Sequence, residues 1–266
     1  MNDFERLEKV FTRVLEDLAP FLPSLILIGG WVPFLYRNWV WQSETIEPVY
    51  TADIDFGIPA FGKNPASQTI YSQLNRLNYL EKHIKMGHLF PVSFYAVTGK
   101  KYESVPVEFI TGEKTSKKTL EAFLGEEIHI HRVDHFDLLV EDPVTVPVKI
   151  GKKTVTIFVP SPERYVLHKL LIYPERNNKE KAGKDAFSAY FVLRFHPEQQ
   201  TWPARIKKLN LGKTASDIKQ ILSRFFNAPS ASGIIQVEKE IGSQISVSNL
   251  RQDIFERFDL LRSWLE

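Results

Sequence analysis

Residues 25–58 read LILIGGWVPFLYRNWVWQSETIEPVYTADIDFGI, and this stretch decides the fold of the chain. It opens with the apolar run 25–28, which is typical of a short buried strand. Gly29 and Gly30 follow directly, where a chain can leave a strand and begin a helix. A glycine pair lets the backbone approach a phosphate closely, and the N-terminus of a following helix favours an anion. We therefore expect a strand, a phosphate-binding turn and a helix in this order.

The stretch ends with two carboxylates, Asp53 and Asp55. Side chains two residues apart in a strand point to the same face, so a strand over 53–58 places these carboxylates together. Ile54 and Phe56 then point to the other face as core anchors. A divalent cation would remove the repulsion between the carboxylates, and oxygen ligands suit Mg²⁺. The alternative is an edge strand with a solvated acidic face, but the glycine turn upstream favours metal-assisted nucleotidyl transfer.

A third carboxylate, Glu108, stands in the apolar sequence VPVEFI at 105–110. We expect this segment to be a strand that neighbours another over 88–97. A carboxylate that faces the core is costly unless it is paired or bound to a cation. On an adjacent strand, Glu108 would complete a two-metal site and could accept the proton of an attacking hydroxyl. In the other reading, Glu108 lies on the solvated face of an alternating strand.

Composition limits the classes of protein to which the chain can belong. Its 266 residues are 43% hydrophobic and 25% charged, as in a globular protein with one large or two modest domains. It has no cysteine, which excludes disulfides and thiolate metal sites and fits a cytoplasmic location. The apolar runs are too short to cross a membrane, so we expect no membrane partner. The net charge of only +2 means that contact with nucleic acid requires a local basic patch.

Periodicity and capping signals predict the remaining elements. We expect the polar segment 112–125 to be partly helical. Residues 128–131 alternate like a strand, which places His129 and His131 on one face, but no third metal ligand is evident. Helices are expected over 3–18, 31–37, 67–80, from Ser161, over 185–195, 214–226 and 249–265, and a hairpin joins 144–148 to 154–159. The fold class is α/β (α+β): a small mixed β-sheet core with flanking helices over 1–160, and a helical C-terminal domain over 161–266.

A basic run lies between the two helices that follow Ser161. Residues 176–185 read RNNKEKAGKD. The run is either a solvated loop between helices or a contact to a triphosphate or an RNA backbone, since Lys and Arg bind phosphate well.

LIGGWVPFL at 27–35, TADIDF at 51–56 and VPVEFI together resemble the DNA polymerase β-like nucleotidyltransferase superfamily. The chain looks most like its AbiEii-type branch, many of whose members are toxins of bacterial toxin–antitoxin pairs. The resemblance covers about residues 24–195. The chain departs from the usual pattern of the superfamily at Gly30, where a serine is common, at the bulky Trp31, and in the long spacer before the acidic strand.

The resemblance implies a nucleotidyltransferase (EC 2.7.7-type) with two Mg²⁺ ions and an NTP such as ATP as substrate. Gly29 and Gly30 would hold the β- and γ-phosphates through backbone N–H groups. Asp53 and Asp55 would bind one Mg²⁺, and the second would lie between them and Glu108, which could serve as the base. The acceptor hydroxyl would attack the α-phosphorus and expel pyrophosphate.

The same branch carries a lysine in a helix after the core and a basic residue followed by aspartate soon after it. Lys169 and the pair Lys184–Asp185 are similar in type and order. The lysines would neutralise phosphate charge, and Asp185 would position Lys169. The acceptor would be tRNA, a protein or a small molecule, and an antitoxin would be a partner. The alternatives are a catalytically silent nucleotidyltransferase fold that serves as a binding or regulatory protein, and an unrelated α/β protein.

Overall fold

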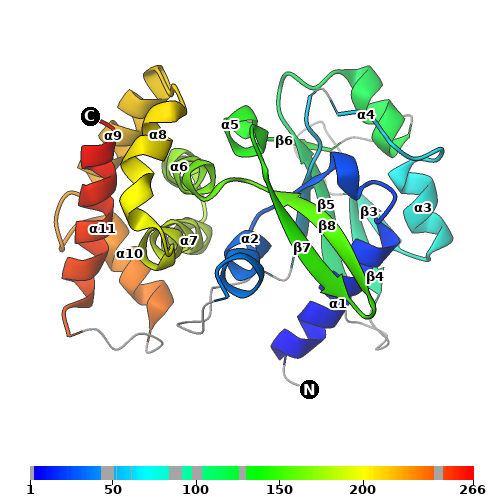
Figure 1. Ribbon diagram of the computed structural model, residues 1–266, viewed down its shortest axis with the longest axis horizontal. Coiled ribbons are helices and arrows are strands. Elements are labelled where there is room, and N and C mark those ends of the chain that lie inside the picture. The colour runs from blue at the N-terminus through cyan, green and yellow to red at the C-terminus, as the bar shows by residue number, and fades with distance from the viewer. Residues whose placement is uncertain are drawn as a thin grey trace. The chain divides into compact units, whose positions relative to one another are not determined.

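A computed structural model describes residues 3–42, 51, 53–60, 62–83, 92–97, 104–125, 130–242 and 248–266. The chain divides into two compact units. Unit 1 comprises Met1–Leu35 and Tyr50–Pro160, and unit 2 comprises Tyr36–Val49 and Ser161–Glu266. Figure 1 labels most of the helices and strands of the two units, which are described separately below.

The described part of unit 1 contains one mixed sheet of eight strands, in the order β3-β4-β5-β2-β1-β8-β7, with β6 paired to the end of β5. Three pairings are parallel: β2 with β5, β1 with β8, and β5 with β6. The expected mixed sheet is therefore present. The strands are β1 Ile26–Ile28, β2 Ile54–Gly57, β3 Leu80–His83, β4 Val92–Val97, β5 Ser104–Thr111, β6 His131–Arg132, β7 Val144–Ile150 and β8 Lys153–Val159.

Most strands predicted from the sequence are confirmed where the structure describes them, but in the predicted strand 128–131 only His131 lies in a strand, β6, and Ile130 does not. β4 and β5 are antiparallel neighbours, and β7 and β8 form the predicted hairpin. Residues 88–91 and His129 lie outside the described residues, so the beginning of one predicted strand and the predicted histidine pair are not described. β3 was not predicted, because its sequence continues the helical pattern before it.

Helices of unit 1 flank the sheet: α1 Asp3–Asp17, η1 Leu22–Ser24, α2 Trp31–Leu35, α3 Ile70–Arg76, α4 Lys117–Leu124 and α5 Phe136–Val140. The apolar face of α1 is buried, as its helical spacing predicts. The predicted helix over 67–80 is wrong at its C-terminal end. Asn78 adopts φ +59°, and the Tyr79 N–H donates to the Leu74 carbonyl, which together cap α3 at that point.

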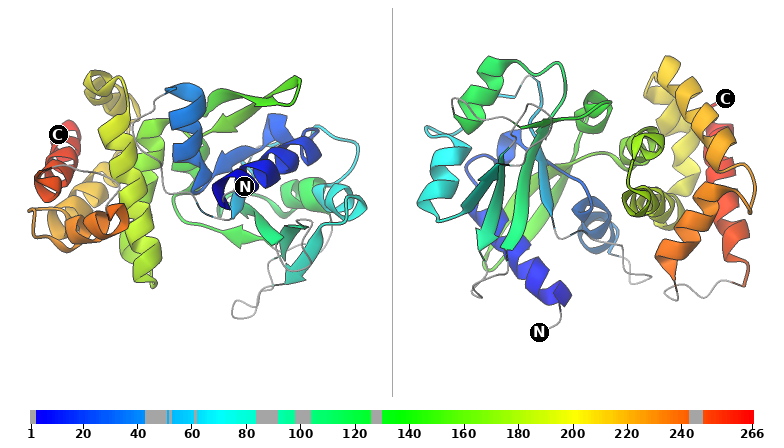
Figure 2. Two further views of the ribbon diagram at one scale, coloured as in Figure 1. Left: turned by 90° about the horizontal axis from the view of Figure 1, so that it is seen from below. Right: turned by 180° about the vertical axis from the view of Figure 1, so that it is seen from behind.

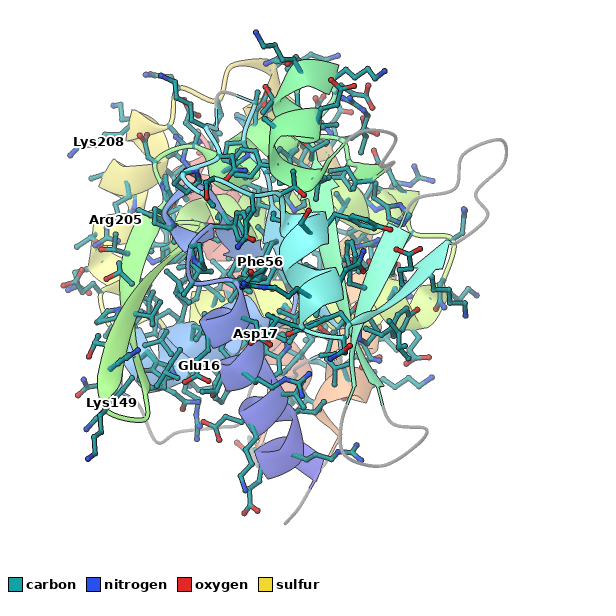
Figure 3. All side chains as sticks on the ribbon, turned by 90° about the vertical axis from the view of Figure 1, so that its right-hand side faces the viewer. Glu16, Asp17, Phe56, Lys149, Arg205 and Lys208 are labelled. Carbon is teal, nitrogen blue, oxygen red and sulfur yellow. The ribbon has the colours of Figure 1, made fainter. Side chains whose placement is uncertain are left out.

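The centre of the sheet is an aromatic core. Ile54 and Phe56 of β2 are fully buried, as the alternation predicts. The ring of Phe56 stacks on Phe109 of β5 at 6.0 Å, and Phe94 of β4 meets Phe109 edge to face at 6.0 Å. Figure 3 labels Phe56 among the side chains of the sheet. Three adjacent strands are therefore fastened by one row of rings.

The described part of unit 2 is helical, and it includes the helices predicted over 214–226 and 249–265. Ser161 caps the first helix, where its hydroxyl accepts a hydrogen bond from the Arg164 N–H. α7 packs against α6, α10 and α11, and Figure 2 shows the bundle in two further views. Its helices are α6 Pro162–Ile172, η3 Tyr173–Glu175, α7 Lys179–Phe195, η4 Gln199–Thr201, α8 Trp202–Lys208, α9 Lys213–Phe225, α10 Ser232–Ile241 and α11 Leu250–Trp264.

The predicted start of the second helix at residue 185 is wrong. α7 begins at Lys179, because the Asn178 side chain accepts hydrogen bonds from the N–H groups of Glu180 and Lys181. Most of the basic run 176–185 is therefore the first two turns of a helix and not a loop.

A segment from the first part of the chain belongs to unit 2. Residues Tyr36–Val40 form a turn of π-helix, η2. Trp41 follows and stacks on Phe191 at 6.4 Å, and its ring meets His196 at 5.3 Å. The chain therefore contributes an aromatic anchor to unit 2 before it returns to complete the sheet of unit 1.

None of the helices in the described residues is both long enough and apolar enough to cross a membrane.

We expect Phe56→Ala to lower the free energy of unfolding of unit 1 by about 3–5 kcal/mol, because it leaves a cavity in the aromatic row. Leu80→Ala is the control, since the Leu80 side chain in the same sheet is 58% exposed. It should change stability by less than about 0.5 kcal/mol. Urea unfolding followed by circular dichroism measures both, and similar losses in the two variants would contradict the assignment of Phe56 to the core.

Candidate functional site

Two of the predicted carboxylates lie side by side in the centre of the sheet. In the parallel pairing of β2 with β5, Asp55 is directly opposite Glu108. On its other side, Asp55 is opposite Ile28 of β1, one residue before Gly29. Asp53 lies one residue before β2 begins, and all three acidic residues are half-buried. The sheet thus brings together the segments that the sequence pattern singled out.

Ser93 of β4 is a member of this group that sequence reasoning missed. The residue is fully buried, and its hydroxyl donates a hydrogen bond of 2.9 Å to Oε1 of Glu108. This bond orients the carboxylate and uses only part of its capacity to accept hydrogen bonds. A serine inside the apolar strand segment VSFYAV was the available signal, but only the register of β4 against β5 gives it a partner.

The glycine turn is packed against the acidic segment. Gly29 adopts φ +77°, and a Cβ added there would lie 2.2 Å from Oδ2 of Asp55. A Cβ on Gly30 would lie 2.5 Å from Oγ1 of Thr51. Side chains from the acidic segment therefore occupy the space that the two missing side chains would need. The phosphate-binding role of the turn stays a prediction, and the geometry adds a second reason for glycine at both positions.

The chemistry of these donors suits a hard cation. In the described residues, no group of three or more His, Asp or Glu side chains converges closely enough to hold a metal ion by itself. Mg²⁺ is commonly bound by one or two carboxylates, with water and substrate phosphates completing its six positions. The adjacent Asp55 and Glu108, with Asp53 nearby in the chain, fit a cation that is completed by phosphates. They do not form a closed cage of protein ligands.

Unit 2 brings together two of its predicted residues. The Lys169 Nζ lies 2.5 Å from Oδ1 of Asp185, and both side chains are buried. Arg176, which the sequence did not single out by itself, places its Nε 2.7 Å from Oδ2 of the same carboxylate. Two cations therefore share one aspartate, and the cluster keeps a net charge of +1.

Electrostatics keep this cluster ionised. Burial lowers the pKa of Lys169, but the adjacent Asp185 carboxylate outweighs burial and holds that pKa well above its ordinary value. Burial raises the pKa of Asp185, and the charges of Lys169 and Arg176 outweigh it, so that this pKa lies below its ordinary value. The Lys169 ammonium also lies 5.5 Å from the centre of the Tyr165 ring, a cation–π contact.

Lys184 is not part of the cluster, although it precedes Asp185 in the chain. Its Nζ pairs at 2.7 Å with Glu180, one turn earlier on the exposed side of α7. Successive residues of a helix point about 100° apart, so neighbours in sequence face different surroundings. The structure therefore places Lys184 at the surface of the helix and Asp185 inside the bundle.

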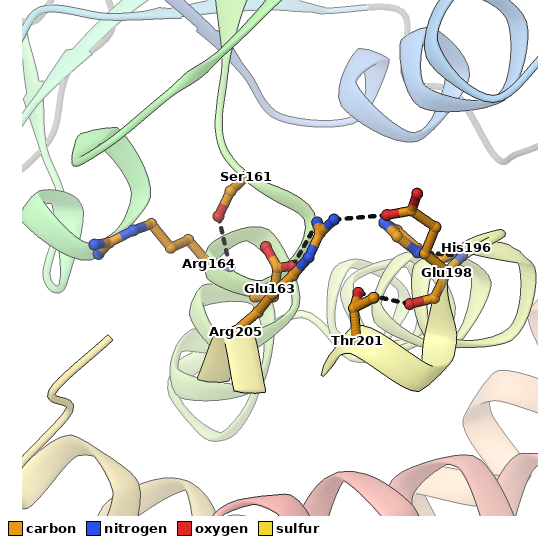
Figure 4. Close-up of polar contacts among 7 residues, drawn as sticks. All are labelled: Ser161, Glu163, Arg164, His196, Glu198, Thr201 and Arg205. Carbon is orange, nitrogen blue, oxygen red and sulfur yellow. Dashed lines mark hydrogen bonds and ion pairs between the residues drawn. The ribbon is translucent and has the colours of Figure 1, made fainter. Parts of the chain in front are cut away.

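A second polar network joins α6 to the segment around α8 (Figure 4). Arg205 donates to the buried Glu163 at 3.0 Å and to Glu198 at 2.7 Å. The Glu198 N–H donates to Nδ1 of His196 at 3.0 Å, and burial lowers the pKa of this histidine. Both carboxylates are occupied by one arginine, which identifies the network as a structural clamp.

Comparison with known proteins gives three results. A family model described as "Nucleotidyltransferase" matches residues 8–209, a range that includes all eight candidate residues. No curated protein matches the chain. Among solved structures, the chain is similar to the "antigenic nucleotidyltransferase-like protein from Paracoccidioides brasiliensis". That match has 16% sequence identity and a TM-score of 0.43, and it covers 81% of this chain and 93% of the other.

We expect Gly29→Ala to destabilise unit 1 more than Gly151→Ala. Both glycines have positive φ, so alanine is strained by about 1–2 kcal/mol at either position. At Gly29 the new methyl must also displace the Asp55 carboxylate, whereas no atom lies within 4 Å at Gly151. Urea unfolding of the two variants measures the difference. Equal losses would contradict the close packing of Asp55 on the turn.

We expect Asp185→Asn to destabilise unit 2 by about 3–5 kcal/mol at pH 7, because it leaves the charge of Lys169 buried without its partner. Glu180→Gln is the control, since it removes only the exposed pair with Lys184 and should change little. The pKa of Asp185 is below its ordinary value of about 3.9, so its contribution is complete above that pH and disappears as the pH falls further. Denaturant unfolding from pH 7 to pH 3 should show the two proteins converging in acid, and a constant difference would contradict the ion pair.

Proposed function

Because the chain belongs to the nucleotidyltransferase family, we propose that it transfers a nucleoside monophosphate from an NTP to a hydroxyl group of an acceptor and releases pyrophosphate. The observation that carries the proposal is the pairing of Asp55 with Glu108 beside the Gly29 turn. It sets two carboxylates next to backbone that can approach a phosphate.

We propose Mg²⁺ as the cofactor, held by Asp53, Asp55 and Glu108. When bound, Mg²⁺ would offset the charge of the triphosphate and lower the pKa of the acceptor hydroxyl. Asp53 and Asp55 would supply the oxygen ligands. Ser93 holds Oε1 of Glu108, so the carboxylate is oriented before substrate arrives and its free oxygen is available to accept the hydroxyl proton.

The cluster of unit 2 would bind the phosphates. Lys169 and Arg176 carry two positive charges and Asp185 carries one negative charge, so the cluster has a net charge of +1. In this proposal Asp185 positions both cations, and Lys184 would exchange its pair with Glu180 for a phosphate. Arg176 is the member with the most exposure, at 37%, and so is the one most open to an anion.

The acceptor would be the 3′ end of a tRNA, a protein hydroxyl or a small molecule. The order of the glycine turn, acidic strand, Lys169 and Lys184–Asp185 supports membership of the AbiEii-type branch. In that case the protein would act as the toxin of a toxin–antitoxin pair and would have an antitoxin partner. A catalytically silent nucleotide-binding protein is the second candidate, because the described residues contain no preformed group of three metal ligands.

We expect the purified protein to transfer label from an α-³²P-labelled NTP to an acceptor in the presence of Mg²⁺. Each NTP would be tested with total tRNA and, separately, with a protein extract. Asp53→Asn/Asp55→Asn should lower the rate by roughly 100-fold or more, since it removes two proposed ligands.

Glu113→Gln/Asp134→Asn is the matched control, because it removes the same charge from two exposed carboxylates of unit 1. It should transfer label at the wild-type rate. NTP binding that needs Mg²⁺, without any transfer, would support the silent alternative. Transfer that survives the Asp53/Asp55 change would contradict the proposed site.

A further inference from the structure

Positive charge is concentrated in one part of unit 2. Residues 199–236 contain six Lys or Arg and a single acidic residue, Asp217, which gives this segment a net charge of +5. The whole chain has a net charge of +2, so the remaining residues together carry −3. A chain with no basic character overall thus carries a strongly basic segment, which includes α8 and α9.

Among the residues that the structure describes, most of these cations have no acidic partner. Arg205 belongs to the clamp with Glu163 and Glu198. The other five make no ion pair among the described residues, and they define the basic surface of α8–α9: Lys207, Lys208, Lys213, Lys219 and Arg224.

The arginines of α7 and α11 behave differently. Arg194 and Arg257 share Asp253, Arg251 pairs with Glu238, and Arg262 contacts Asp259. These four arginines are therefore paired with carboxylates, and Arg194 and Arg251 join different helices. The basic surface of α8–α9 keeps its charge available to another molecule.

The connection between the two helices gathers three of the lysines. Lys207 and Lys208 end α8, and Lys213 begins α9 after only four residues. Asn210 and Gly212 of this short connection adopt φ +49° and +52°. All three lysines are exposed, and Figure 3 shows the Lys208 side chain extending from the ribbon.

Arg224 extends the surface along α9. Its guanidinium lies 4.9 Å from the centre of the Phe225 ring, which restrains the side chain, and it remains exposed. Asp217 lies one turn from Lys213 without an ion pair to it. Lys207, Lys208, Lys213 and Arg224 are thus exposed cations on two consecutive helices, and such a surface suits a chain of negative charges.

We propose that the basic surface of α8–α9 binds the phosphate backbone of an RNA. This inference rests on the proposed function, because it selects RNA among the acceptors and assigns the surface that holds its backbone while a terminal hydroxyl reacts. Contacts from lysines to phosphates carry no sequence information, so binding is independent of sequence and falls steeply with salt. RNA would then be recognised through unit 2.

Binding of labelled total tRNA, without NTP, tests the proposal across a range of salt concentrations. Lys207→Ala/Lys208→Ala/Lys213→Ala should weaken binding about 10- to 100-fold near 0.1 M salt and reduce the slope of log K against log salt by about 2–3. The matched control is Lys149→Ala/Lys152→Ala/Lys153→Ala, which removes three exposed lysines from the β7–β8 hairpin. It should bind with the wild-type slope. Urea unfolding of each variant verifies that the fold is kept.

Three outcomes overturn the proposal: an unchanged slope in the α8–α9 variant, an equal change in the hairpin control, or equal competition by polyglutamate at the same charge concentration. The last would assign the surface to acidic proteins. Because no NTP is present, the result is independent of the transfer assay. If the wild-type protein binds tRNA with the expected salt dependence but transfers no nucleotide, the result counts against the proposed function. If the wild-type protein transfers label to RNA but the α8–α9 variant binds tRNA with an unaltered salt slope, the result counts against this surface alone.

Discussion

The parallel pairing of β2 with β5 is the constraint on which the rest of unit 1 depends. It sets Asp55 beside Glu108 on one face of the sheet. Like charges that lie directly opposite each other on neighbouring strands are destabilising. The same register buries four apolar side chains, Ile54, Phe56, Val107 and Phe109. At about 1.5–3 kcal/mol each, burial contributes about 6–12 kcal/mol and outweighs the repulsion.

In unit 2, the charged site depends on a single carboxylate, Asp185, that two cations share. A buried ion pair is seldom a large net source of stability, because desolvation offsets the attraction between the charges. Its effect is geometric: Asp185 fixes the end of a long, flexible lysine side chain and a neighbouring arginine at one place. The chain therefore has one charged site formed by strand register and another formed by helix packing.

The sequence predicted those features that depend on local rules. Alternation placed Ile54 and Phe56 in the core and Asp55 on the opposite face, and the glycine pair marked the end of β1. Ser161 and the proline after it marked the start of α6. These signals need only a few consecutive residues, so a single sequence contains them.

The features that sequence reasoning missed depend on contacts between distant residues. Ser93 acquires its role only when β4 is registered against β5, and Arg176 only when the start of α7 is known. The run before Asp185 looked like a loop because it is polar, and the cap at Asn178 was not recognised. A helix this polar at its start is sustained by the packing of its later turns, which sequence patterns do not show.

The passage of the chain from unit 1 to unit 2 and back has a consequence for folding during synthesis. Trp41 is made 150 residues before Phe191, the ring on which it stacks. At roughly 5–20 residues per second, about 8–30 s separate the two. During that interval the ring on which Trp41 stacks has not yet been made. Unit 2 therefore cannot finish folding until almost the whole chain has been translated, because it combines Tyr36–Val49 with Ser161–Glu266.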